Sequence, residues 1–151
     1  MPALILIYSG IDIFASLGRP EQKKAADRND YIDWCNRYLP LATLGCDAID
    51  LYAARCGVVH AYGMGSSLSE AGKAVEIIYS WGTANPEDLR RILAQLKVPE
   101  KRVLHIETLA TAFSNGLAVF LKELESDAEK RKMVVRRAGK FFKNQPKGFW
   151  R

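Results

Sequence analysis

Residues 49–62 read IDLYAARCGVVHAY and carry an arginine, one of the two histidines of the chain and a tyrosine in a short span. Apolar side chains recur there at helical spacing and predict one buried helix face: Ile49, Tyr52, Ala53, Cys56 and Val59. Arg55 falls off this stripe. We therefore expect a helix that presents Arg55 to solvent or to a partner side chain.

The same helix should gather three reactive side chains near its end. On a continuous α-helix at about 100° per residue, Tyr62 would lie within roughly 20° of Arg55, and His60 about 140° away. A long arginine side chain can close that gap, and Gly57 can loosen the last turns. Gly63 should end the helix soon after Tyr62.

Residues 55–62, RCGVVHAY, resemble the R-x4-6-H signature of HEPN domains, and Tyr62 matches the longer R-x4-H-x-Y form. That form is similar to the toxin of toxin–antitoxin pairs whose antitoxin is a minimal nucleotidyltransferase. The resemblance implies a helical bundle that forms a homodimer, with Arg55 and His60 as a metal-independent RNA-cleaving site across the dimer. It also implies that Tyr62 is where the nucleotidyltransferase partner attaches adenylate, and that no cofactor takes part.

The composition indicates a single intracellular domain. At 151 residues the chain is long enough to bury a core without staples. Its three cysteines, Cys35, Cys46 and Cys56, form no C-x2-C pair, which favours reduced thiols and the cytoplasm. With His60 and His105 as the only imidazoles, we expect no metal site.

The first segment, residues 3–17, is nearly all apolar but short, and it contains Asp12. No lysine or arginine precedes it, so neither a membrane span nor a signal peptide fits, and we expect a buried helix. A carboxylate in that setting needs a partner. Arg55 and Arg37 are the candidate cations.

Charge is divided unevenly along the chain. Residues 1–129 hold 13 Lys and Arg against 17 Asp and Glu, a net −4, whereas residues 130–151 hold nine Lys and Arg and no acid, a net +9. A cationic terminal segment is typical of a nucleic-acid or acidic-partner contact, although a solvated helix face is the commoner explanation. The candidate nucleic-acid-binding residues are Lys130, Arg131, Lys132, Arg136, Arg137 and Lys140.

A strand, a helix and a second strand follow the central helix. Residues 75–81 alternate with the β-branched and aromatic enrichment of a strand, and Asn85 with Pro86 is a strong helix start. Residues 102–106 complete the order, which allows a two-stranded parallel ribbon. His105 lies in this second strand and is expected to be structural.

The remaining segments predict helices. Asn29 or Asp30 should cap a helix that Pro40 ends, residues 108–124 should form a long helix, and Ser126 should cap the last one. The fold class is therefore mainly α: a HEPN-like helical bundle with a small two-stranded β ribbon.

We expect one domain over residues 1–143. A β/α insertion near residues 72–106 interrupts it, and residues 144–151 form a basic aromatic tail.

Three functions remain open at this point. The first is an RNA-binding protein that cuts RNA with Arg55 and His60. The second is a non-catalytic binding or regulatory module in which Arg55 merely pairs with Asp12 or Asp50. The third is an interaction protein whose basic last helix docks an acidic partner. Exposure of Arg55 in a cleft would favour the first, and its use in an internal ion pair would favour the second.

Overall fold

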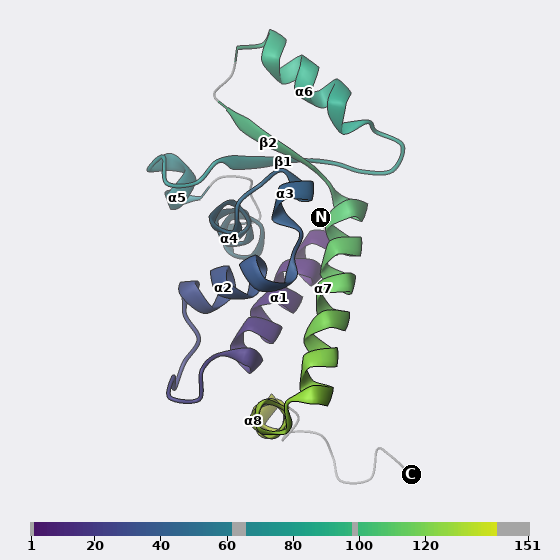
Figure 1. The fold of residues 1–151 in the computed structure, drawn as a ribbon. Helices are drawn as coiled ribbons and strands as arrows, with labels where there is room; N and C mark the ends of the chain where they lie inside the picture. The colour runs from purple at the N-terminus through teal and green to yellow at the C-terminus, as the bar shows by residue number, and fades with distance from the viewer. Residues whose placement is uncertain (1, 62–65, 98–99, 142–151) are drawn as a thin grey trace.

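The computed structural model is mainly helical, with one small parallel sheet (Figure 1). It describes residues 2–61, 66–97 and 100–141, without the side chains of residues 60, 61 and 141. The expected tail at 144–151 therefore lies outside the described residues. Within the described ranges, no helix is long and apolar enough to cross a membrane.

Three helices build most of the core. They are α1 (Pro2–Gly18), α2 (Arg28–Tyr38) and α7 (Ile106–Ser126), and each packs against the other two. The fully buried side chains Tyr8 and Ile11 of α1 lie among Tyr31 of α2 and Leu109 of α7. The expectation of a buried first helix is confirmed for one face, whereas Leu6 and Ile13 of α1 are 73% and 46% exposed.

The central helix α4 (Ala48–Cys56) follows a short turn of helix, α3 (Leu41–Leu44). Asp47 and Asp50 form the capping box that starts α4. Of the stripe expected from the sequence, Ala53 is buried and Tyr52 and Val59 are partly buried against the core, but Ala48, Leu51 and Ala54 are buried as well. The expected single stripe is too narrow because α4 has neighbours on several sides, α2, β1 and α5 among them.

The sheet contains two parallel strands, β1 (Glu76–Ser80) and β2 (Lys101–His105), joined through α6 (Pro86–Gln95). A four-residue helix, α5 (Ser67–Glu70), precedes β1. The sheet lies between α6 and the helical bundle (Figure 1). The strand–helix–strand prediction is confirmed, and β2 runs directly into α7, where His105 occupies the N-cap position.

The last helix, α8 (Ala128–Phe141), crosses the end of the bundle farthest from α6 (Figure 1). Two predicted helix starts were wrong by a few residues. Asp27 caps α2 in place of Asn29 or Asp30, and the Asp127 carboxylate accepts a hydrogen bond from the backbone N–H of Lys130 at the start of α8. In each case a nearby aspartate has the competing carboxylate: Asp27 lies two or three residues before the expected caps of α2, and Asp127 lies one residue after Ser126.

Candidate functional site

Arg55 lies at the junction of α1 and α4, where it forms an ion pair with Asp12. Its Nε donates to Asp12 Oδ2 at 2.6 Å, and the two side chains are 19% and 31% exposed. Burial lowers the pKa of Arg55, but the hydrogen bond to Asp12, the charge of Asp12 and the Cys56 thiol together outweigh that effect, so the pKa lies above its ordinary value. The expected partner of Asp12 is thus Arg55, and Arg37 pairs elsewhere.

Asp50, the other carboxylate considered for Arg55, has different partners. It is 2% exposed, and it accepts hydrogen bonds from the backbone N–H groups of Val75 at 2.7 Å and Asp47 at 3.0 Å. Arg102 of β2 lies 3.6 Å away. Asp50 therefore ties α4 to the sheet.

A change of helix type separates the arginine and the histidine of the motif. The α-helix ends at Cys56, and residues Gly57–Ala61 form a π-helix, η1. A π-helix has i→i+5 hydrogen bonds, so residues five apart lie closer to one face than on an α-helix. The backbone of His60 is therefore nearer to the face of Arg55 than the 140° expected for a continuous α-helix.

The structure describes the three predicted catalytic residues to different extents. The structure describes the backbone of His60 within η1 but not its side chain, and Tyr62 lies outside the described residues. Of these three residues, Arg55 alone has a described side chain. Short π-helical segments within α-helices occur frequently at functional sites.

Tyr52 is a neighbour of Arg55 that sequence reasoning assigned only to the core. The guanidinium carbon of Arg55 lies 6.0 Å from the centre of the Tyr52 ring, and Tyr31 packs edge-on against the same ring at 5.4 Å. Its spacing from Arg55, one helical turn, was the signal that could have identified it.

The six basic residues predicted on the last helix divide into three groups. Arg131 and Lys140 are exposed. Lys132 and Arg136 are also exposed but pair with acids: Lys132 Nζ lies 2.8 Å from Glu129, and Arg136 Nη2 lies 2.6 Å from Glu21. Lys130 and Arg137 donate hydrogen bonds to other helices and turns of the fold.

Arg137 was expected on the solvent-facing side of α8, and that expectation was wrong. It is 7% exposed, and its guanidinium donates to the carbonyl oxygens of Leu17 at 2.9 Å and Pro20 at 3.0 Å, and to that of Arg19. These carbonyls end α1 and form the turn after it. Arginine has several donors in a fixed plane, so it can satisfy a cluster of such acceptors.

Lys130 belongs to a cluster that joins α2, α7 and α8. Its Nζ donates to Glu123 Oε2 at 2.7 Å and to the Tyr38 hydroxyl at 3.1 Å, and Arg37 donates to the same carboxylate. Burial raises the pKa of Glu123, but hydrogen bonds from Lys130, Tyr38 and Arg37 outweigh it and lower the pKa to about 2. No local sequence pattern indicates this long-range cluster.

The described residues show no cluster of metal-ion ligands, and the contacts of the second histidine, His105, are also defined. No three His, Cys, Asp or Glu side chains gather there as a metal ion would require. His105 holds Gly82 and Glu107 around the β2–α7 junction: Nε2 lies 3.2 Å from the Gly82 carbonyl oxygen, and Nδ1 lies 2.9 Å from Glu107. These contacts fit the structural role expected for His105.

Comparison with known proteins adds no relative. No family model, no curated protein and no solved structure matches this chain. The resemblance to HEPN domains therefore rests on residues 55–62 alone.

Proposed function

We propose that this chain is an HEPN-like, RNA-binding protein that cleaves RNA without a metal ion, with Arg55 and His60 as its catalytic residues. The observation that carries the proposal is the arrangement around the R-x4-H-x-Y motif. Asp12 fixes the arginine at a helix junction, and a π-helix begins between the arginine and the histidine. The mainly helical architecture is compatible with it.

The chemistry follows from the two side chains. An imidazole with a pKa near neutral takes the proton of the ribose 2′-hydroxyl, which then attacks the adjacent phosphate. A guanidinium stabilises the negative charge that grows on the phosphate oxygens. Because the motif holds one histidine, His60 of a second copy protonates the leaving oxygen, so the active species is a homodimer. Tyr62 orients the phosphate, or receives adenylate from a nucleotidyltransferase antitoxin.

Asp12 has a defined role in this proposal. A carboxylate bound to Nε fixes the plane of the guanidinium, which lowers the entropy lost when arginine engages a phosphate. The exposed cations of α8, led by Arg131 and Lys140, bind RNA backbone away from the cut. Lys130 and Arg137 have no part in it, because the fold already uses them.

A second candidate is a non-catalytic binding module, and the same ion pair favours it. Arg55 is mostly buried against Asp12, as expected of a structural arginine that fastens α4 to α1. In that case RNA or an acidic protein would bind through α8 alone. The two candidates differ in whether RNA is cut.

Changes to the RNA substrate give the sharpest test between the nuclease and the binding module. Purified protein is incubated in excess chelator with a structured and an unstructured RNA, and with each RNA carrying a single deoxyribose at the mapped cut. Attack by the 2′-hydroxyl must leave a 2′,3′-cyclic phosphate, and the deoxyribose must block that cut alone. Intact RNA under all conditions would remove the nuclease and leave the binding module.

A further inference from the structure

A groove of about 510 Å³ adjoins the motif, between the start of α2, one side of α4 and α5. Its lining mixes polar and apolar side chains: Asp27, Arg28, Asn29, Tyr52, Cys56, Ser66, Ser67 and Leu68. Tyr52 and Cys56 stand on either side of Arg55 in the sequence of α4. Arg55 does not line the groove itself, but its Nη1 lies 4.0 Å from the sulfur of Cys56, which does.

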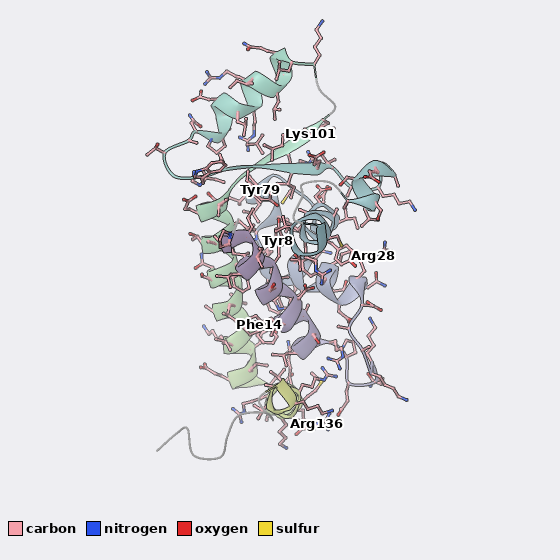
Figure 2. The ribbon with its side chains drawn as sticks, turned by 180° about the vertical axis from the view of Figure 1, so that it is seen from behind. Tyr8, Phe14, Arg28, Tyr79, Lys101 and Arg136 are labelled. Atoms are coloured by element: carbon pink, nitrogen blue, oxygen red, sulfur yellow. The ribbon has the colours of Figure 1, made fainter. Side chains whose placement is uncertain are left out.

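Arg28 supplies the positive charge of this groove. It is exposed and has no ion-pair partner among the described residues. Asp27, the one acid in the lining, is already engaged: its carboxylate accepts from the backbone N–H of Asn29 at 2.8 Å and pairs with Lys23 at 2.9 Å. Figure 2 shows Arg28 at the side of the molecule, close to α4.

The pKa of Tyr52, in the lining of the groove, is subject to opposing effects. Burial raises its pKa most, and the Cys56 thiol raises it further, while Arg55 and Arg28 act in the opposite direction. The guanidinium carbon of Arg55 lies 6.0 Å from the centre of the Tyr52 ring, and Arg28 lines the same groove as Tyr52. Edge-on packing against Tyr31 helps to hold the ring in place.

We propose that this groove binds one nucleotide of the RNA beside the bond that Arg55 and His60 cut, with its phosphate on Arg28 and its base or ribose against Tyr52. This inference rests on the proposed function and extends it to the path of the substrate. An unpaired arginine and an aromatic ring are the two elements by which proteins bind single-stranded RNA. In an RNA chain each nucleoside lies between two phosphates, and the structure offers two cations, Arg28 in the groove and Arg55 at 6.0 Å from the Tyr52 ring.

The test measures binding without cleavage. In the full-length His60→Ala protein, the affinity for a short single-stranded RNA is measured at several salt concentrations, with and without Arg28→Ala. Loss of one phosphate contact should lower the slope of log affinity against log salt by about 0.7. Arg91→Ala, an exposed arginine on α6, is the matched control and should leave the slope unchanged. An equal slope for Arg28→Ala and the control would overturn the proposal.

Two further arms identify the ligand. A nucleoside 3′,5′-bisphosphate should displace the RNA at lower concentration than inorganic phosphate, and Arg28→Ala should remove that advantage. Equal displacement by inorganic phosphate would mean a general anion site and defeat the nucleotide assignment. Wild-type protein that binds RNA through Arg28 but cuts nothing would end the cleavage proposal while supporting the groove.

Discussion

The helical bundle and helix α6 bury their apolar side chains to different degrees. In the bundle, Leu51 of α4 and Leu109 of α7 are completely buried. Helix α6 has no buried residue: its Ile92 is 50% exposed, and Leu96 at its C-cap is 65% exposed. Stability should therefore reside in the bundle, which also holds Arg55, and α6 should contribute little.

The largest expected difference is between two apolar truncations. Leu51→Ala removes a fully buried side chain and should lower the free energy of unfolding by about 2–5 kcal/mol. Ile92→Ala, the matched truncation on α6, should lower it by less than about 1 kcal/mol. Urea unfolding followed by circular dichroism measures both. Equal losses would show that α6 is as important to stability as the bundle.

A close helix contact gives the next largest effect. A Cβ on Gly116 of α7 would lie 2.7 Å from the backbone carbonyl oxygen of Tyr38, so Gly116→Ala must push α7 away from the end of α2. We expect a loss of about 1–3 kcal/mol. Gly139 of α8 has nothing within 4 Å of such a Cβ, and Gly139→Ala should instead stabilise by roughly 0.5–1 kcal/mol.

The same thermal or urea measurement compares the two glycine variants. If Gly116→Ala is as stable as wild type, α2 and α7 pack more loosely than the contact between Gly116 and Tyr38 indicates.

The smallest effect concerns acid stability of the Glu123 cluster, which fastens α8 to the bundle. Because the pKa of Glu123 is depressed to about 2, its contribution is present above the unfolded value of about 4.3 and is lost as the pH falls toward 2. Glu123→Gln should lower stability at pH 7 by about 1 kcal/mol and flatten its decline between pH 4 and 2. Glu125→Gln, an exposed neighbour, is the control. A decline as steep as that of wild type would contradict the role of Glu123.

Local signals in the sequence predicted much of the fold. Asn85 and Pro86 marked the start of α6, Asp47 and Asp50 marked that of α4, and alternation marked β1, because caps and periodicity act over a few residues. The pairing of Asp12 with Arg55 was also expected, since a carboxylate in an apolar helix needs a cation.

Features set by distant contacts were not predicted. The buried position of Arg137 depends on carbonyls about 120 residues earlier, which no local pattern reports. Gly57 suggested a loosened helix, but its π-helical form and its effect on the position of His60 came only from the structure. The groove at Arg28 likewise joins residues from α2, α4 and α5.

The rate of RNA cleavage in chelator by wild type, by His60→Ala and by Arg55→Ala tests the central claim most directly. Removal of a proton-transfer group typically costs about 10²–10⁴ in rate, so His60→Ala should cut at no more than about a hundredth of the wild-type rate while circular dichroism shows it folded. Arg55→Ala should lose a similar factor through lost charge stabilisation, and Tyr62→Phe should be milder. Metal-independent cleavage by wild type that disappears in His60→Ala is the predicted result. A folded His60→Ala protein that cuts as fast as wild type would contradict the account.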